Sequence, residues 1–526
     1  MQSAICKIHK SIAIAMVNPQ QLFSFPMFIP LLLFIFMTWK ILKKYASSSP
    51  KLPPGPSKLP LIGSIHHLIH PVPHHRLRDL SDKHGPIMHL QLGQVSTVII
   101  SSPDIAKLIM KTHDANFADR PFVLAVEIVT YNFKDIGAAP YGEYWRNLRK
   151  LCTTELLSMK RVQSFRSIRE EEVSKMVESI ALSVDSPVNF SKMVTYLTYG
   201  IISRAAFGKV WEGEEIFVPV VQKLIEAASG FNIADIYPSM KFLHVMSGIK
   251  GRVEKLHKRI DLIFDDILNE HKAKKIGNKI EGEEEEDVQE DFVDVLLKFQ
   301  GRNDLQFVLS DESIKAVILD MFSAGSETSS TTVEWAMAEM MKNPKVLKKA
   351  QEEVRQVLGP NAGVQEQNLQ QLPYLKMIIK ETLRLHPPFP LLLPRECREN
   401  CVINGYDIPS KSKLMVNVWA IGRDPNYWSD PESFIPERFI DNGIDYKGHN
   451  FEFLPFGAGR RMCPGISFGI ADVEFPLAML LYHFDWKLPK GLKPEDLDMA
   501  ESFGAGVRKK DDLYLIPTPY FSQSED

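Results

Sequence analysis

The stretch FEFLPFGAGRRMCPG, residues 451–465, decides how the rest of the chain is understood, because it sets one cysteine in a loop rich in glycine. The cysteine is Cys463. Gly457, Gly459 and Gly465 allow tight turns, which can bring backbone N–H groups close to the sulfur. A thiolate needs such donors, since its charge must be stabilised away from water. The loop therefore predicts a cysteine that acts as a ligand.

Two side chains extend this prediction. Phe456 offers the sulfur an apolar shield, and Arg461 lies two residues before Cys463. Haem iron can be held by a cysteine thiolate, a ligand that pushes electron density onto the iron and favours O–O cleavage. The arginine would then pair with the haem carboxylates. The alternative is a buried cysteine in an ordinary turn, but chance poorly explains so many suitable residues in so short a stretch.

The same residues follow the pattern Phe-x-x-Gly-x-Arg-x-Cys-x-Gly without a departure. The fixed positions are Phe456, Gly459, Arg461, Cys463 and Gly465. This pattern is the haem-ligand signature of the cytochrome P450 family, which the chain resembles here. The resemblance implies a haem b group whose iron has Cys463 as its axial ligand. The further cofactor-binding residues that it implies in this loop are Phe456, Gly457, Arg461 and Gly465.

Composition agrees with one large catalytic domain. The 526 residues contain no internal repeat and no long linker in the body, and a hydrophobic content of 44% is normal for a globular core. A net charge of -3 argues against nucleic acid as a partner, since binding phosphates needs a basic excess. The five cysteines are few and scattered, which fits a reducing compartment without a disulfide framework.

The N-terminal region predicts a membrane anchor. Residues 22–39 form a run without charge that is just long enough to span a bilayer as a helix. A cleaved signal peptide is the alternative, but the run is long for one and no Ala-x-Ala-like site follows it. The lysines after the run place the body on the cytosolic side. The predicted topology is single-pass in the endoplasmic reticulum membrane.

The predicted domain plan follows from this anchor. Residues 1–21 would form a short lumenal lead, although Met16 is an alternative start that would make residues 1–15 an upstream extension. Residues 40–56 form a basic, proline-rich hinge, because prolines fix φ and remove backbone donors. Residues 57–526 form the cytosolic catalytic domain.

A long helix is predicted from Ser310 to Lys342. Ser310 is a good N-cap, and the helical pattern stops at Asn343-Pro344. At about 1.5 Å per residue the helix spans about 50 Å, so it must cross the domain and be buried. The segment SAGSETSSTT, residues 323–332, interrupts its apolar pattern. We expect the glycine and the hydroxyl groups to open the helix there, because hydroxyls can bond to carbonyls one turn back.

The middle of this helix carries a second motif. Close packing against another helix accounts for Ala324 and Gly325, but not for Glu327 beside Thr328. The stretch resembles the Ala-Gly-x-(Asp/Glu)-Thr-(Thr/Ser) motif of the same family. The resemblance implies a groove for O2, in which Thr328 hydrogen-bonds the oxygen being activated and Glu327, with water, relays protons. Both residues are therefore predicted to be catalytic.

Other parts of the chain resemble the haem contacts and the structural core of this family. Trp145 and Arg149 lie one turn apart on a predicted helix, which alone would indicate only a surface helix. With the cysteine loop present, they and Arg395 resemble the clamp on the haem propionates. Glu381 and Arg384 can pair at i, i+3, and the family joins such a pair to a later arginine. The implied structural triad, which braces the cysteine loop, is Glu381, Arg384 and Arg438.

The substrate pocket is predicted from position and apolar character. Its expected wall comprises Met321, Ala324, Gly325, Leu391, Leu392, Leu393, Phe503 and Ala505. The predicted fold class is mainly α with a small β region, the cytochrome P450 fold behind a single N-terminal transmembrane helix. One β hairpin is predicted at residues 89–100, and another, with an Asn-Gly turn, at residues 402–408.

The resemblance implies a plant microsomal monooxygenase. The segments MFSAGSETSSTTVEWAMAEM and FGAGRRMCPGISFG carry a likeness to plant members that oxidise terpenoids. The expected reaction inserts oxygen from O2 into an apolar sesquiterpene or diterpene. Electrons would come from NADPH through a separate NADPH–cytochrome P450 reductase, with cytochrome b5 as an optional donor. Alkaloid or phenolic substrates are the alternative within the family. A haem-thiolate isomerase or a non-catalytic haem sensor would not need Glu327 and Thr328.

Overall fold

The computed structural model describes Phe34, Thr38 and residues 50–520, with gaps at 211–213, 229–231, 282–288, 303–306, 360–364, Lys490 and Ala505. Contacts within the chain divide it into two compact units, Met1–Leu52 and Pro53–Asp526. No helix among the described residues is both long and apolar enough to cross a membrane. The predicted anchor at residues 22–39 lies outside the described residues except for Phe34 and Thr38, and the lumenal lead lies outside them entirely.

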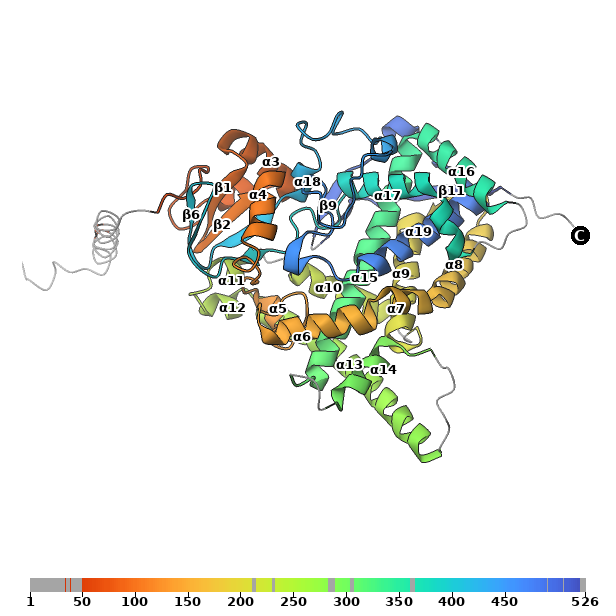
Figure 1. Cartoon of the computed structure of the whole chain (residues 1–526), viewed down its shortest axis with the longest axis horizontal. Coiled ribbons are helices and arrows are strands. Elements are labelled where there is room, and N and C mark those ends of the chain that lie inside the picture. The colour runs from red at the N-terminus through yellow and green to blue at the C-terminus, as the bar shows by residue number, and fades with distance from the viewer. Residues whose placement is uncertain are drawn as a thin grey trace, which may run out of the picture. The chain divides into compact units, whose positions relative to one another are not determined.

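The second unit is mainly helical, as predicted (Figure 1). Its α-helices are α3 (Pro73–His84), α4 (Pro103–Lys107), α5 (Leu124–Val129), α6 (Glu143–Leu151), α7 (Met159–Ser164), α8 (Arg166–Ala181), α9 (Phe190–Phe207), α10 (Glu214–Ala227), α11 (Ile233–Ile236), α12 (Phe242–Met246), α13 (Ile249–Glu281), α14 (Phe292–Gln300), α15 (Asp311–Lys342), α16 (Pro344–Leu358), α17 (Pro373–Leu385), α18 (Val418–Ile421) and α19 (Ile466–His483). Short 3-10 helices lie at Ile65–Leu68, Glu366–Gln371, Pro436–Phe439, Gly459–Arg461 and Pro494–Asp496, and π-helical turns at Leu108–Thr112 and Cys152–Leu156.

Short strands form four small sheets in the described part of the chain. The strands are β1 (Ile87–Leu92), β2 (Val95–Ile100), β3 (Val188–Asn189), β4 (Arg395–Glu396), β5 (Cys401–Ile403), β6 (Tyr406–Ile408), β7 (Lys413–Val416), β8 (Phe484–Lys487), β9 (Glu501–Phe503), β10 (Val507–Lys509) and β11 (Tyr514–Pro519). The largest sheet has the order β1-β2-β7-β4, the next has the order β3-β11-β8, and β5-β6 and β9-β10 form pairs. Figure 1 shows β1 and β2 gathered with α3 and α4, away from α8, α16 and α19.

Helix α15 begins and ends where the sequence predicts. The side chain of Ser310 accepts a hydrogen bond from the backbone N–H of Ser313, which caps the helix, and Asn343 follows its last residue. Most residues of α15 are buried, and the helix packs along α9 and against α19 (Figure 1). The prediction of a central, buried helix is confirmed.

The predicted opening of this helix is wrong. α15 runs as a continuous α-helix through residues 323–332. Ser326 Oγ donates to the carbonyl of Phe322 at 2.7 Å, and Thr332 Oγ1 donates to that of Thr328 at 2.8 Å. A carbonyl oxygen has two lone pairs, so it can accept from a hydroxyl and keep its helical N–H partner. The hydroxyl groups are thus satisfied inside an intact helix.

Both predicted hairpins are confirmed. β1 and β2 pair antiparallel with Leu92 opposite Val95, and the turn residue Gly93 has a φ of 58°. In the second hairpin, Asn404 and Gly405 have φ values of 49° and 78°. Two successive positive φ values are what a tight hairpin turn of this kind requires, which explains the Asn-Gly pair.

The four-stranded sheet is buried on both faces. Val98 and Ile100 belong to an apolar cluster on one face, whereas Ile99 between them belongs to a cluster on the other. The first of these clusters reaches Leu454 and Ala458 in the cysteine loop. The sheet therefore supports the loop from one side, while α19 continues from its end.

Candidate active site

The cysteine loop runs from the 3-10 turn Gly459–Arg461 into α19. The backbone N–H of Cys463 donates to the carbonyl of Phe456 at 3.0 Å, and the N–H of Gly465 donates to the Cys463 sulfur. Gly465 is also the N-cap of α19. The sulfur thus lies at the N-terminus of an 18-residue helix, where free N–H groups favour negative charge.

Glycine is required at two of the three predicted positions. Gly457 and Gly459 have φ values of 69° and 70°. A Cβ atom at Gly459 would lie 2.1 Å from the carbonyl oxygen of Met110, so only glycine fits there. Gly465 differs, because its φ is -95° and a Cβ atom there would meet nothing within 4 Å. The prediction that Gly465 permits a tight turn is therefore wrong, and its contribution is its N–H group.

The surroundings of the sulfur suit a thiolate ligand. Burial raises the pKa of the Cys463 thiol, whereas the Gly465 N–H and the charge of Arg149 lower it. A metal ion bound to the sulfur would remove the proton outright. The ring of Phe456, predicted as an apolar shield, packs against that of Tyr446, with their centres 5.4 Å apart.

The predicted clamp residues lie together beside the cysteine loop. The guanidinium of Arg461 lies 4.2 Å from the centre of the Trp145 ring, and that of Arg149 lies 5.4 Å from it. Arg149 also donates to the carbonyl of Met462. The indole N–H of Trp145 donates to the backbone carbonyl of Ile136 at 3.0 Å, rather than to a carboxylate.

A fourth arginine, Arg120, lies at this place, and it was not among the predicted site residues. Its Nε donates to the carbonyl of Gly137 at 2.9 Å, and its Nη1 donates to those of Leu393 and Pro394, both at 2.8 Å. The guanidinium therefore joins three separate turns of the chain. The available signal was an Asp-Arg pair set within the otherwise apolar stretch 117–122, which an exposed loop would not contain.

The arginines crowd one another. Burial, and after it the charge of Arg395, lower the pKa of Arg461 to about 10. Burial, and after it the charges of Arg461 and Arg395, also lower the pKa of Arg120. Arg395 donates to Asp114 at 2.9 Å, but it shares that carboxylate with Arg460. Asp135 also lies near Arg120 and Arg461, but burial raises the pKa of its carboxyl to about 6, so the charge of the buried arginines is not fully balanced and favours a bound anion. The donor set therefore fits a group that brings two carboxylates, as haem does.

Glu381, Arg384 and Arg438 form one buried cluster. Arg384 donates to both carboxylate oxygens of Glu381, at 2.7 and 2.8 Å, and Arg438 donates to one of them at 2.9 Å. Arg384 also donates to the carbonyls of Gly422 and Pro431 at 2.6 and 2.7 Å. The cluster ties α17 to the segment that leads to the cysteine loop.

Trp428 connects this cluster with the cysteine loop. The guanidinium groups of Arg384 and Arg438 lie 5.2 and 5.9 Å from the centre of its ring. The ring meets that of Phe453 edge-on, with their centres 6.3 Å apart. Phe453 belongs to residues 451–465, so the contact supports a structural role for the cluster.

Thr328 lies at the centre of α15, where the helix is least covered. Its Oγ1 donates to the carbonyl of Ala324 at 2.7 Å. Ala324 is exposed and Thr328 is half-buried, although most of α15 is buried. A small exposed side chain in the middle of a buried helix lets a bound group approach the helix closely at this point.

Glu327 lies next to Thr328 and is half-buried. Burial raises the pKa of its carboxyl, the charge of Arg508 on β10 lowers it, and Glu226 raises it further. Arg508 itself is exposed. A carboxyl with a raised pKa, placed between a buried helix and an exposed cation, is suited to take up and release protons.

The predicted pocket residues do not lie in one cluster. Leu391 packs in the apolar cluster on one face of the four-stranded sheet, and Phe503 packs against that cluster. Met321 is buried in the larger core around α15, and Leu393 is 47% exposed. Phe503 also lines a cavity of about 380 Å³, together with Ile65, Leu68, Ile69, Pro73, Leu92, Glu226, Ile236 and Gly504.

The remaining pocket predictions have different outcomes. Leu392 is half-buried and reaches toward the cysteine loop, since its Cδ1 lies 3.5 Å from the position of a Cβ atom on Gly457. A Cβ atom on Gly325 would lie 3.2 Å from Ile202 of α9, so this glycine allows the two helices to approach. Ala505 lies outside the described residues.

Comparisons with known proteins decide the family. Residues 53–516 match the sequence profile described as Cytochrome P450. The chain belongs to the cytochrome P450 family. This cytochrome P450 is 55% identical to desmethyl-deoxy-podophyllotoxin synthase of Sinopodophyllum hexandrum, over 94% of this chain and 97% of the relative. It is 53% identical to premnaspirodiene oxygenase of Hyoscyamus muticus, over 93% of this chain and 96% of the relative.

The fold agrees with this assignment. A zebra fish cytochrome P450 solved with progesterone superposes with a TM-score of 0.73 at 23% identity, covering 85% of this chain and 100% of that one. Cytochromes P450 bind haem through a cysteine thiolate and use O2 with electrons derived from NADPH, generally through a reductase. This cytochrome P450 is therefore a monooxygenase that acts on a small molecule.

Proposed function

We propose that this cytochrome P450 hydroxylates, or oxidises further, an apolar sesquiterpene or diterpene in plant specialised metabolism. The observation that carries the proposal is the mostly apolar lining of the cavity beside β9, in which Phe503, Leu92 and Ile236 outnumber the single carboxylate of Glu226. A hydrocarbon skeleton gains free energy on leaving water for such a lining, whereas a polar substrate would lose hydrogen bonds to water that few groups in this lining could replace. The relative named premnaspirodiene oxygenase supports the same choice.

Identity alone does not choose the substrate. The relative named for a podophyllotoxin product is 55% identical to this chain, and the relative named for a diene is 53% identical. The choice of a terpene therefore depends on the lining of the cavity. Turnover of an alkaloid or a phenolic compound is a possible result of the test below.

Cys463 would hold the haem iron. Bound haem supplies the iron centre at which O2 is activated. The N–H of Gly465 and the charge of Arg149 would stabilise the thiolate, as they do for the sulfur here. Arg120, Arg149, Arg395 and Arg461 would bind the two carboxylates, and this would offset the burial and the mutual repulsion that lower the pKa values of Arg120 and Arg461.

Thr328 and Glu327 would deliver protons to the place next to the middle of α15 where O2 would bind. The Thr328 hydroxyl would turn from the carbonyl of Ala324, to which it now donates at 2.7 Å, and donate into the pocket. Glu327 would resupply the proton from solvent near Arg508, because burial already raises the pKa of this carboxyl. The buried triad of Glu381, Arg384 and Arg438 would act only by keeping the cysteine loop in place.

The cellular setting follows from the N-terminal sequence. Residues 22–39 would anchor the enzyme as a single-pass protein of the endoplasmic reticulum, and residues 57–526 would face the cytosol. NADPH–cytochrome P450 reductase would then meet the catalytic domain at the same membrane, with cytochrome b5 as an optional second donor.

The test is turnover with labelled oxygen. The enzyme is co-expressed with a plant reductase, and its microsomes receive panels of sesquiterpenes, diterpenes, alkaloids and phenolics under ¹⁸O2. We expect an NADPH-dependent terpene product that carries ¹⁸O, which mass spectrometry detects. Turnover of alkaloids or phenolics alone would overturn the terpene assignment, and a terpene product without the label would overturn oxygen insertion.

A further inference from the structure

A cluster of three histidines surrounds one buried carboxylate, away from the cysteine loop. The carboxylate is Glu501, the first residue of β9. His74 and His75 at the N-terminus of α3 place their Nε2 atoms 2.7 and 2.9 Å from the same oxygen, Oε2 of Glu501. His386, which follows α17, places Nδ1 3.8 Å from the other oxygen, Oε1.

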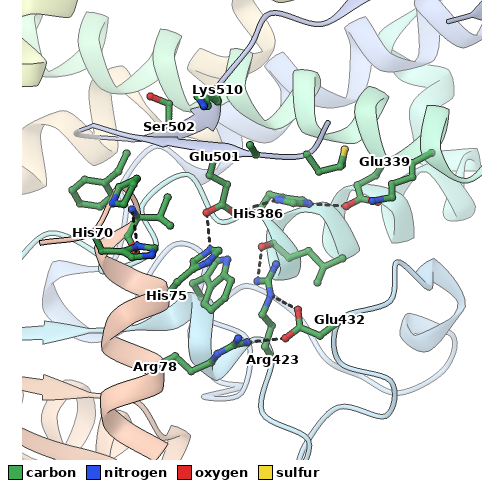
Figure 2. A pocket seen from close by; sticks show the side chains of 18 residues that line it. His70, His75, Arg78, Glu339, His386, Arg423, Glu432, Glu501, Ser502 and Lys510 are labelled. Carbon is green, nitrogen blue, oxygen red and sulfur yellow. Dashed lines mark hydrogen bonds and ion pairs between the residues drawn. The ribbon is translucent and has the colours of Figure 1, made fainter. Parts of the chain in front are cut away.

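This cluster borders a cavity of about 700 Å³ (Figure 2). Figure 2 shows Glu501 between His75 and His386, with His75 reaching it from α3. His74 is fully buried and Glu501 nearly so, whereas the side chain of His75 is 36% exposed. Solvent therefore reaches the shared carboxylate oxygen from the side of His75.

The donor atoms form a set that transition metals use. The two Nε2 atoms and the carboxylate oxygen all lie within 4.8 Å of one another. Two imidazoles and one glutamate, with open space for water, are the ligands of several zinc sites. Mg²⁺ and Ca²⁺ prefer sets made only of oxygen atoms, so this set selects against them.

His386 supplies a second, independent indication of a cation. Its ring is 8% exposed, and its Nδ1 has no hydrogen-bond partner among the described residues. Nε2 pairs with Glu339 at 2.7 Å, and the ring stacks on Trp335 with the centres 4.0 Å apart. Nδ1 faces Oε1 of Glu501 at 3.8 Å, which is too far for a hydrogen bond. A buried imidazole nitrogen directed at the cluster without a hydrogen bond is a feature that a bound cation would satisfy.

The arginines near this cluster form their hydrogen bonds with a different carboxylate, although the charge of Arg423 also acts on Glu501. Arg423 Nε and Arg78 Nη1 lie 3.0 and 2.7 Å from the two oxygens of Glu432. Figure 2 shows these bonds below His75. The hydrogen-bond partners that the structure records for the Glu501 carboxylate are imidazoles, which can lose their N–H protons to a metal ion.

We propose that His74, His75 and Glu501 form a binding site for one divalent transition-metal ion, with Zn²⁺ as the ion that best fits the donors. His386 lies behind the carboxylate, where it orients Glu501 or becomes a fourth ligand. A bound ion would tie α3 to β9, the strand that ends at Phe503 beside the apolar cavity. This site is separate from Cys463 and does not depend on the proposed substrate.

The test is a calorimetric titration of the haem-loaded enzyme. Tag-free protein is dialysed against EDTA and then titrated with ZnCl2, and with MgCl2 in parallel. We expect one equivalent of Zn²⁺ to bind and no heat from Mg²⁺. His75→Ala removes a partly exposed ligand and should weaken Zn²⁺ binding at least about tenfold, which corresponds to about 1.4 kcal/mol.

Two variants serve as matched controls. His70→Ala removes a histidine that lines the same cavity but lies outside the cluster. Cys401→Ser removes one thiol of the pair Cys397–Cys401, whose sulfur atoms are 3.9 Å apart and could also bind zinc. Both variants should bind Zn²⁺ as the wild type does. Equal affinity in wild type and His75→Ala, or loss of binding in Cys401→Ser, would overturn the proposal.

A second measurement needs no variant. Crystals of the wild type with Zn²⁺, measured at the zinc absorption edge, should show an anomalous peak about 2.1 Å from Nε2 of His74 and His75. The absence of a peak at this position would overturn the proposal and leave the cluster as a hydrogen-bond network.

Discussion

The cysteine loop and the pocket side of this cytochrome P450 are built in opposite ways. Around the loop, Arg384, Arg395 and Arg461 are each less than 9% exposed, and each donates to backbone carbonyls or carboxylates. On the pocket side, Phe503 is half-buried against apolar neighbours such as Leu391. Hydrogen bonds and ion pairs stabilise the region around the cysteine loop, whereas apolar packing stabilises the pocket side.

This difference explains how the substrate can change between family members while the reaction stays the same. A buried charge has to keep its partners, so the geometry around the sulfur tolerates little change. Apolar contacts tolerate substitution as long as volume is kept, so a pocket wall can change its shape at small cost. Relatives of about equal identity that are named for different compounds agree with this view.

The largest effect is expected from Glu381→Ala. The substitution leaves Arg384, which is 1% exposed, without its carboxylate, and removing one partner of a buried pair costs about 3–5 kcal/mol. Haem content and the denaturant midpoint should both fall. The control is Glu352→Ala, since its pair with Lys348 is exposed at the surface of α16 and is worth less than about 1 kcal/mol. If haem content and the denaturant midpoint fell equally in both variants, the buried ion pair would contribute no more to stability than the surface pair does.

On the oxygen side, Thr328→Ala should uncouple the reaction. We expect product per NADPH to fall roughly tenfold while NADPH is still consumed, because proton delivery by a positioned hydroxyl is lost. Thr332 lies one turn later on α15 and makes the same kind of bond, at 2.8 Å to the carbonyl of Thr328. Thr332→Ala should therefore keep normal coupling. The measurement is the amount of product and of hydrogen peroxide formed per NADPH consumed. Tight coupling in Thr328→Ala would contradict the proposed role of Thr328 in proton delivery.

The pH dependence of stability should report Asp472 on α19. This carboxyl is fully buried, and burial raises its pKa to about 7 against the opposing charge of Arg169. A carboxyl whose pKa is higher in the folded state stabilises the fold at low pH, and this contribution is lost as pH rises from about 4 to about 7. The loss amounts to at most about 4 kcal/mol.

Asp472→Asn removes this group without changing its size. Denaturant midpoints at pH 5 and pH 7.5 should therefore differ less in the variant than in the wild type. An unchanged difference between the two pH values would show that this carboxyl does not titrate in the folded protein.

The smallest effect on stability, and the sharpest on selectivity, is expected from Phe503→Ala. Haem content should stay normal, while the pattern of products changes, because the substitution enlarges the mostly apolar cavity of about 380 Å³. Leu393→Ala is the matched control, since this side chain is 47% exposed. A changed product pattern in Leu393→Ala, with none in Phe503→Ala, would place the pocket elsewhere.

Features that depend on residues close in sequence could be predicted. The ends of α15, both hairpins and the glycines at positions 457 and 459 follow from local backbone chemistry. Arg120 and the cluster at Glu501 were missed, because their partners come from distant segments. His74 and Glu501 are 427 positions apart and share no local pattern.

The apolar side chains show the other limit of the sequence. Met321 is as apolar as Leu391, yet it lies in the core around α15 while Leu391 packs against the sheet. Helical spacing marks a buried face, but it does not distinguish packing from contact with a ligand. The substrate wall could therefore be predicted only by position in the family.

The central claim is that Cys463 holds the haem iron, and the ferrous–CO spectrum tests it most directly. The wild type should show the red-shifted Soret band of a thiolate ligand, and Cys463→Ser should lose it. Cys152→Ser, which changes another buried free cysteine, should keep the band. A red-shifted band that persists in Cys463→Ser, or that disappears in Cys152→Ser, would contradict the assignment.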